Sequence, residues 1–332
     1  MINDKPELDI LMSTHNGDKY IHNQINSIIS QTYNNWRLMI VDDGSSDNTN
    51  DHIDYFSFKD SRITVIKSEN RNIGPSQSFI NVLKKSSSSY FMFADQDDVW
   101  LPEKISLTLH ALANEHTDNS LPRLVYSDLQ VVDRDLQVIH PSFLKYQRLK
   151  PAKFASFRRE LLQNIVTGCT LGGNAALREK ALQVMNGMTE SIIMHDWWLA
   201  LVAFYFGTAT YLPAAPILYR QHGANQLGAK GSGFKRYAAM LKDPSTLERA
   251  IAYLNKVSRQ NRLFLETYES ELASDDKKLL KLIADSEDNW TAKSLCTCFS
   301  QGASFKTLDC SLSFLAAVLL HPYLTSHGSG PS

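Results

Sequence analysis

The sequence FMFADQDDVW, residues 91–100, contains an apolar run that stops at three carboxylates, Asp95, Asp97 and Asp98. Because the run follows polar residues 86–89, it is typical of a buried strand that ends near residue 94. Like charges clustered at the end of a buried strand are costly unless a cation neutralises them. Carboxylates suit Mg²⁺ and Mn²⁺, so the stretch predicts a divalent metal that bridges it to the phosphates of a bound nucleotide.

The same residues also allow a structural interpretation. An Asp-rich loop can be a solvated turn or a cap for the next helix, and Pro102 favours a helix that runs from about residue 102 to 113. The sequence around this stretch decides between the two interpretations.

The N-terminal half alternates strand-like and helix-like segments. In the first expected helix, Ile21, Ile25, Ile28 and Ile29 share one face, whereas residues 38–41 form the unbroken apolar run of a buried parallel strand. We expect strands at residues 8–13, 36–42, 63–67 and 90–94, and helices at residues 20–31, 49–58 and 75–85. This rhythm predicts an α/β fold, Rossmann-like, with a mostly parallel central sheet flanked by helices and a ligand-binding edge at the carboxyl ends of the strands.

The second half is less regular. It holds an apolar segment at residues 196–206 and a predicted strand at residues 217–220. Residues 230–262 then carry eight basic residues and only two acidic ones, Asp243 and Glu248. Read as helices, these residues form either a basic face attracted to anionic lipid or a solvated helical surface.

Composition narrows the class of protein. The chain has 332 residues, 43% of them hydrophobic, and its 34 Lys and Arg balance 35 Asp and Glu, so we expect no nucleic-acid partner. The polar start lacks a signal core, which predicts a cytoplasmic protein, and the four cysteines fit reduced thiols. Residues 308–324 are apolar and indicate either core or contact with a membrane surface.

Four loops with polar side chains follow the expected strands. They are STHN at 13–16, VDDGSSD at 41–47, NRNIGP at 70–75 with Asn81 further on, and DQDD at 95–98. Small polar residues in the first loop can present backbone groups to a flat base, and an aspartate in the second can accept the imide N–H of uracil or thymine. Ordinary helix caps explain part of each loop as well.

In this order the four loops resemble those of the family 2 glycosyltransferases, which have the GT-A fold. The similarity continues through TGCTLGGNAA at 167–176, MHDWW at 194–198 and YRQHGAN at 219–225, and it is greatest to bacterial rhamnosyltransferases of surface polysaccharide synthesis. The resemblance implies a GT-A catalytic domain at residues 1–228. The residues beyond it predict a helical C-terminal region at 229–326 that makes dimer or membrane-surface contacts, and a flexible tail at 327–332.

The resemblance also implies roles for individual residues. A nucleoside diphosphate sugar would lie with its base near Thr14 and Asp43 or Asp42, its ribose near Asp95, and its diphosphate on Mn²⁺ or Mg²⁺. Asp97 would hold the metal, and His222 would complete the metal shell or contact the diphosphate. Arg220 would neutralise phosphate charge, and either His222 or Arg220 could instead be a structural hydrogen-bonder. The remaining donor-binding residues implied by the motifs are Asn16, Asn72, Gly74 and Asn81.

Acceptor and base come from the later motifs. Asp196 matches the catalytic base of an inverting transfer, while the neighbouring His195 is expected to pack or orient. Gly172, Gly173 and Asn174 are expected to form a tight turn near the acceptor, or simply a turn that ends a strand. Trp197 and Trp198 either stack on a sugar ring or belong to the core.

The expected activity is therefore metal-dependent, inverting transfer of a sugar from a dTDP- or UDP-sugar, with L-rhamnose favoured. The acceptor would be a glycan or a lipid-linked glycan of cell-surface polysaccharide, and the enzyme would be cytoplasmic or peripheral at the inner face of the membrane. A nucleotidyltransferase requires a Gly-rich loop with Arg and Lys after the first strand, and STHNGDKY does not provide one. A dehydrogenase requires GxGxxG, and this motif follows none of the predicted strands. A non-catalytic glycan-binding protein would be favoured only by loss of Asp95, Asp97 and Asp196.

Overall fold

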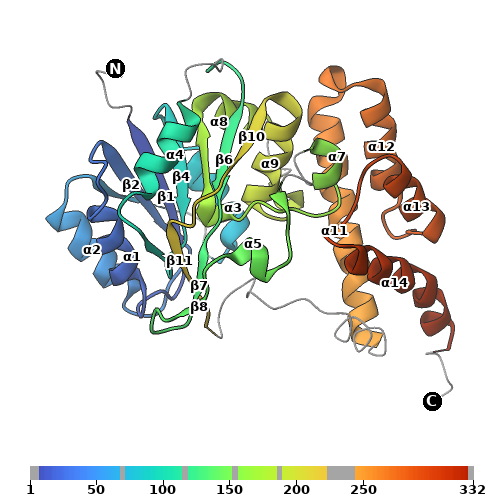
Figure 1. The fold of residues 1–332 in the computed structure, drawn as a ribbon, viewed down its shortest axis with the longest axis horizontal. Coiled ribbons are helices and arrows are strands. Elements are labelled where there is room, and N and C mark those ends of the chain that lie inside the picture. Colours follow the sequence, from blue (N-terminus) through green and yellow to red (C-terminus); the bar gives the residue numbers. More distant parts are fainter. Residues whose placement is uncertain are drawn as a thin grey trace. The chain divides into compact units, whose positions relative to one another are not determined.

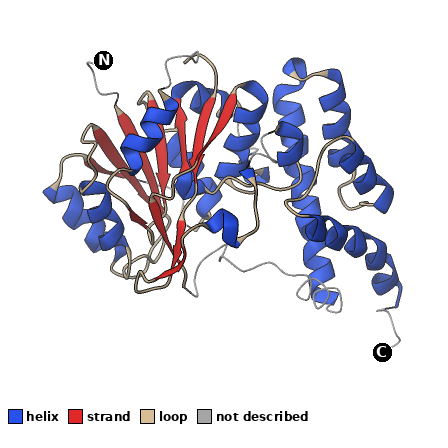
Figure 2. Cartoon of the chain, in the orientation of Figure 1, coloured by secondary structure: helices blue, strands red, loops and turns tan. Residues whose placement is uncertain are grey.

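The central element of the protein is a seven-stranded sheet in the order β10-β6-β9-β4-β1-β2-β3 (Figures 1 and 2). The computed structural model describes residues 7–67, 72–113, 119–151, 156–184, 189–222 and 244–327. The strands are β1 Leu8–Thr14, β2 Trp36–Asp42, β3 Ile63–Ile66, β4 Tyr90–Ala94, β6 Arg123–Ser127, β9 Leu171–Asn174 and β10 Thr208–Leu212. Neighbouring strands run parallel except at β9, which is antiparallel to both β4 and β6. The predicted α/β fold with a mostly parallel sheet is confirmed.

Helices cover both faces of this sheet (Figure 2). They are α1 Ile21–Ile29, α2 Thr49–Lys59, α3 Pro75–Leu83, α4 Lys104–Leu112, α8 Ala175–Ala181 and α9 His195–Phe206, with the short α5 Phe143–Tyr146 and the 3₁₀ turn η1 Gly168–Thr170 in connecting segments. On one face, alternate residues of β1, β2 and β4 form a core with α1, α2 and α4 that includes Ile10, Ile25 and Leu109. On the other face, Phe93 of β4 contacts Phe79 of α3 and His195 of α9.

A smaller sheet lies beyond the end of β4. It has the order β5-β11-β7-β8, with β5 Val99–Trp100, β11 Ile217–Arg220, β7 Gln130–Val132 and β8 Val138–His140. Because β5 pairs with β11, the acidic loop between β4 and β5 lies beside the end of β11. This pairing is what brings Asp95 to Asp98 next to Arg220 and His222.

The chain divides into two compact units, and the second does not consist of the C-terminal residues alone. Residues 148–165 and 183–193, which the sequence assigned to the N-terminal domain, group with residues 231–332. The reason is local packing: Leu161 and Leu162 offer their carbonyl oxygens to Asn261 Nδ2 and Tyr253 Oη, each at 2.9 Å. A boundary placed only at residue 228 misses these two earlier segments.

The second unit is helical. Its elements are α7 Phe157–Glu160, η2 Thr189–Ser191, α11 Pro244–Tyr268, η3 Glu269–Glu271, α12 Ser274–Asp285, α13 Ala292–Ser300 and α14 Leu308–His327. In α11 the guanidinium groups of Arg259 and Arg262 both pair with Glu287, at 2.6 and 2.7 Å, so these two charges do not form an unpaired basic face. The basic residues at 230, 235, 236 and 242, and residues 328–332 of the expected tail, lie outside the described residues.

The last helix exposes apolar side chains. In α14, Leu308, Leu312, Leu319 and Leu320 are all exposed. Among the described residues no helix combines the length and apolarity that crossing a membrane requires. The dimer or membrane-surface contact expected of this region stays a prediction.

Candidate active site

Three carboxylates converge where β4 ends. Asp95 and Asp97 belong to the loop that follows Ala94, and Asp196 lies in the first turn of α9. Burial, and then the negative charges of Asp97 and Asp196, raise the pKa of Asp95 to about 7. The pKa is raised because ionising Asp95 adds a charge to an enclosed site that is already negative. The site therefore favours a bound cation.

Asp97 lies beside His222. Asp97 Oδ2 and His222 Nε2 are 2.8 Å apart, and the two side chains are 17% and 14% exposed, so a cation from solvent can reach both. The imidazole ring stacks on Tyr20 with the ring centroids 4.8 Å apart, which fixes its orientation. The structure thus brings together the two residues that were predicted to hold the metal.

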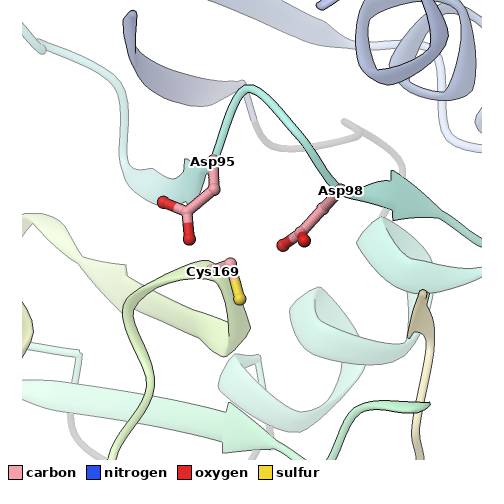
Figure 3. Close-up of side chains that lie close together, drawn as sticks. All are labelled: Asp95, Asp98 and Cys169. Carbon is pink, nitrogen blue, oxygen red and sulfur yellow. The ribbon is translucent and has the colours of Figure 1, made fainter. Parts of the chain in front are cut away.

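A second cluster lies deeper. Asp95, Asp98 and Cys169 each place a ligand atom within 4.8 Å of the others, and Figure 3 shows the two carboxylates facing one another above the thiol. Burial and the nearby carboxylates raise the pKa of Cys169 well above its ordinary value, so it stays a thiol. Lys104, fully buried near Asp98 and Cys169, already supplies positive charge there, although burial lowers its pKa to about 8.

The donor set at Asp97 fits Mn²⁺ or Mg²⁺ better than the deeper cluster does. Carboxylate oxygen and imidazole nitrogen are ordinary ligands of these ions, whereas a protonated thiol is a poor one. Asp98 Oδ1 accepts the backbone N–H of Arg220 at 3.3 Å, and burial together with the charges of Asp97 and Asp95 raises the pKa of Asp98 well above its ordinary value, which favours its protonated form. Asp97 and His222, with Asp95 close by, are therefore the candidate metal-binding residues.

Arg220 holds the acidic loop in place. Its Nε donates to the backbone carbonyl of Asp97 at 2.9 Å, another guanidinium nitrogen donates to the carbonyl of Arg134, and the guanidinium lies over the ring of Tyr20. The side chain is 2% exposed. These contacts orient Asp97 and match the structural hydrogen-bonding role that the sequence left open for Arg220. The expected contact of Arg220 with phosphate stays a prediction.

The second loop separates the roles of its two aspartates. Asp42 accepts hydrogen bonds from Thr14 Oγ1, the backbone N–H groups of Gly44 and Ser45, and the side chains of Ser45 and Asn50. These bonds lower its pKa despite partial burial, and they use both oxygens for organising the loop. Asp42 and Thr14 were expected to bind the base, but their side-chain bonds make them organisers of the loop.

Asp43 keeps the capacity to bind a base. Its two carboxylate oxygens accept one backbone N–H each, from Ile73 at 2.9 Å and Gly74 at 2.8 Å, at the start of α3. Gly74 has a φ of +83°, a conformation that favours glycine, and Asn72 has a φ of +57° and donates its N–H to the Asp43 carbonyl. A carboxylate has about four acceptor sites, so Asp43 is the better partner for an imide N–H.

The first loop is tied to the second through Asn16. Its N–H donates to Ser45 Oγ, and its Oδ1 accepts the N–H of Ser46, both at 2.9 Å. Its φ of +49° is one that asparagine tolerates. Asn81 lies in α3 and is half-buried. Donor contacts of both asparagines stay predictions.

Asp196 and His195 differ sharply. Asp196 accepts its neighbour's backbone N–H, that of Trp197, at 2.6 Å. Burial lowers the pKa of His195 to about 3, and its ring packs between Phe79 and Phe93 with neither nitrogen hydrogen-bonded within the described residues. His195 is therefore a neutral packing residue, as expected, and Asp196 is the group beside the acidic loop that can take a proton.

Two tryptophans that were candidates for sugar stacking belong to the core. Trp197 and Trp198 are 3% and 2% exposed, and Trp198 Nε1 donates to the carbonyl of Ala181 at 3.0 Å. Because α9 is apolar on all sides and covered by its neighbours, both rings are enclosed by protein. The interpretation that Trp197 and Trp198 stack on a sugar ring is therefore wrong, and the alternative that they belong to the core is confirmed.

The predicted tight turn at Gly172, Gly173 and Asn174 is also wrong. These residues form β9, a buried strand between β4 and β6. Asn174 caps α8 by accepting the N–H of Leu177, and its amide donates to the carbonyl of Leu121. The three residues build the sheet, and we remove them from the acceptor site.

Several residues of the site carried no signal in the sequence. Lys104 and Cys169 are ordinary members of a helix and of a loop until the fold brings them to Asp98. Gln96, the uncharged residue between Asp95 and Asp97, bonds to the first loop. Spacing within a motif cannot show such contacts, because Cys169 lies about seventy residues from Asp98 and Gln96 lies about eighty residues from His15.

Comparison with known proteins finds glycosyltransferases. The sequence model of glycosyl transferase family 2 matches residues 9–185. The dTDP-rhamnosyl transferase RfbG of Shigella flexneri is 28% identical over 234 residues, which cover 68% of this chain and 76% of that protein. The Escherichia coli UDP-Glc:alpha-D-GlcNAc-diphosphoundecaprenol beta-1,3-glucosyltransferase WfgD is 28% identical over 145 residues, 43% of this chain and 54% of that protein.

Solved structures share the fold. S. aureus TarS 1–349 in complex with UDP-GlcNAc has a TM-score of 0.54 at 13% identity, covering 98% of this chain and 93% of that one. The mannosyltransferase PcManGT from Pyrobaculum calidifontis, in complex with GDP-Man and Mn²⁺, has a TM-score of 0.51 at 16% identity, covering 97% and 88%. At these identities the likeness is one of fold.

Proposed function

Because this chain belongs to glycosyl transferase family 2, we propose that it transfers L-rhamnose from dTDP-L-rhamnose, or otherwise a sugar from a UDP-sugar, with inversion at the anomeric carbon. The observation that carries the proposal is the convergence of Asp95, Asp97 and Asp196, which raises the pKa of Asp95. The name of the rhamnosyl transferase RfbG supports the choice of sugar.

Each group in the site has a part in this reaction. Asp97 and His222 would hold Mn²⁺ or Mg²⁺, and Arg220 keeps Asp97 oriented through its backbone carbonyl. When bound, the metal would supply positive charge that favours departure of the diphosphate. Asp43 would accept the imide N–H of the base, next to the backbone N–H groups of residues 73 and 74.

Asp196 would act as the general base. The acceptor hydroxyl oxygen forms a bond to the anomeric carbon while the bond from that carbon to the diphosphate oxygen breaks, and the hydroxyl proton passes to the Asp196 carboxylate. A single displacement of this kind inverts the anomeric centre and needs no covalent intermediate with the protein. The position of Asp196 near Asp95, among the described residues, supports its assignment as this base.

The proposed acceptor is a glycan or a lipid-linked glycan of cell-surface polysaccharide. The acceptor in the printed name of WfgD, a diphosphoundecaprenol-linked sugar, supports this class. We infer that the chain works at the inner face of the membrane, where such an acceptor is anchored. The exposed leucines of α14 are compatible with that location.

A donor screen tests the proposal. Thermal unfolding is followed with dTDP-rhamnose, UDP-glucose, UDP-galactose and UDP-N-acetylglucosamine, each with Mn²⁺, Mg²⁺ or EDTA. We expect dTDP-rhamnose to raise Tm in the presence of metal only, since a ligand selective for the native state stabilises it. No stabilisation by any nucleotide sugar would contradict the proposal.

Two variants divide the site. Asp97→Ala should abolish the metal-dependent rise in Tm, whereas Asp196→Asn should keep it and lose turnover, because Asp196 is assigned to proton transfer and not to donor binding. An Asp196→Asn enzyme with full turnover would remove that residue as the base.

A further inference from the structure

Gln96 connects the acidic loop to the first loop. Its Oε1 accepts the backbone N–H of His15, and its Nε2 donates to the backbone carbonyl of the same residue, both at 2.9 Å. The carboxamide thus pairs with His15 as a neighbouring strand would. Only a side chain with both an acceptor and a donor in this arrangement can make the pair, which excludes glutamate.

Gly17 leaves the space that this pair needs. A Cβ built at residue 17 would lie 2.3 Å from Gln96 Oε1 and 2.7 Å from its Cδ. Gly17 does not have a positive φ, so its backbone could accommodate alanine. A larger residue at position 17 is excluded because its Cβ would clash with Gln96, and not because the backbone conformation there favours glycine.

The first loop is held from its other side as well. Asn16 bonds to Ser45 and Ser46, and Gly17 donates its N–H to Thr49 Oγ1 at 2.7 Å. Among the described residues, Gln96 links the acidic loop to this assembly through its two bonds to His15.

We propose that Gln96 is a positioning residue for the donor: it fixes the separation between the loops that receive the base and the loop that receives the metal and diphosphate. This inference rests on the proposed function, since the base and the diphosphate of one molecule must span that separation. Without the pair, each loop can still form, but the two no longer hold the distance that a nucleoside diphosphate requires.

Kinetics of variants test the role. Gln96→Ala and Gln96→Glu should each raise the donor KM about tenfold, the loss expected for two hydrogen bonds that are open to water, with kcat nearly unchanged. Gln130→Ala is the matched control, because Gln130 also donates from its carboxamide to a backbone carbonyl, that of Ala215, in the smaller sheet. It should leave the donor KM unchanged.

A double-mutant cycle makes the test specific. Gly17→Ala alone should raise the donor KM, because the new methyl group displaces Gln96, whereas Gly17→Ala added to Gln96→Ala should have little further effect. A purely structural role would lower Tm and kcat with KM unchanged. Additive effects of the two changes, or an unchanged KM in Gln96→Ala, would overturn the proposal.

Hydrogen exchange separates this proposal from the proposed function. Exchange of the His15 amide should accelerate in Gln96→Ala and Gln96→Glu but not in Gln130→Ala, with no nucleotide present. Unchanged exchange would show that the pair does not hold the loop. If the exchange changes as expected but the wild-type protein binds no nucleotide sugar, the proposed function fails and the positioning role fails with it.

Discussion

At the scale of single residues, Asp42 and Asp43 accept hydrogen bonds from different groups although they are neighbours in the chain. Asp42 and Asp43 are equivalent in VDDGSSD, and the structure separates them because Thr14 and Asn50 take up the oxygens of Asp42. Which lone pairs remain available depends on residues brought together by folding. For the same reason the motif could not show that Arg220 donates to the backbone carbonyl of Asp97.

His195 carries a prediction about acid stability. Its pKa is about 3 in the folded protein, against 6.5 for a histidine in an unfolded chain. Between these values the unfolded state binds a proton that the folded state does not, so stability falls as pH falls from 6.5 toward 3. This residue alone accounts for up to about 1.4 kcal/mol of that loss per pH unit.

Replacing His195 by leucine should therefore reduce the loss of unfolding free energy between pH 6.5 and 4.5 by about 2 kcal/mol. Urea unfolding at both pH values measures it. The exposed His110→Leu is the control and should keep the pH dependence of the wild type. Equal pH dependence in His195→Leu and wild type would show that the buried ring is not the cause.

At the scale of elements, long apolar patterns were predicted well and β9 was missed. Strands β2, β4 and β11 have the bounds that their apolar runs indicate. LGGN has no such run, and it is a strand because its backbone pairs with β4 and β6 on either side. Gly172 and Gly173 leave room for the side chains of Thr108, Phe91 and Leu177. A local sequence pattern cannot show this, because these neighbours come from other elements.

Gly173→Ala tests this reassignment. An added Cβ would lie 2.6 Å from Phe91 Cζ and 2.8 Å from Leu177 Cδ2, so we expect a loss of about 1–3 kcal/mol in unfolding free energy by denaturant titration. The acceptor KM should not change. Thr210→Ala, at an exposed position of β10, should cost less than about 0.5 kcal/mol. A raised acceptor KM without lost stability would restore the acceptor role of this glycine.

At the scale of the whole molecule, the fold class followed from the βαβ rhythm, but the division of the chain did not. Hydrophobic residues of α7 and the following segment, such as Phe157 and Leu162, are buried against α11, about a hundred residues later in sequence. The amino-acid composition of residues 148–165 does not indicate that they pack against α11. A boundary drawn from the sequence alone therefore cut through a unit.

A fragment of residues 1–230 is expected to be less stable than the full chain and to expose hydrophobic surface. Without α11, the buried Phe157, Leu161 and Leu162 lose their cover, so the fragment should bind ANS and unfold at lower temperature than the full chain. Dye fluorescence and a thermal scan, with the full chain as control, measure both effects. A fragment that matches the full chain in both would show that the boundary at residue 228 is adequate.

The return of α11 to residues 157–165 has a consequence for biosynthesis. A ribosome adds about 5–20 residues per second, so Phe157 waits roughly 5–20 seconds after synthesis before Phe264, its aromatic neighbour at 5.2 Å, exists at all. During that interval the nascent chain exposes the hydrophobic residues of 157–165, which lie in sequence between strands of the central sheet. Holdase chaperones that shield such segments should therefore determine the yield of this protein more than the intrinsic folding of its α/β half does.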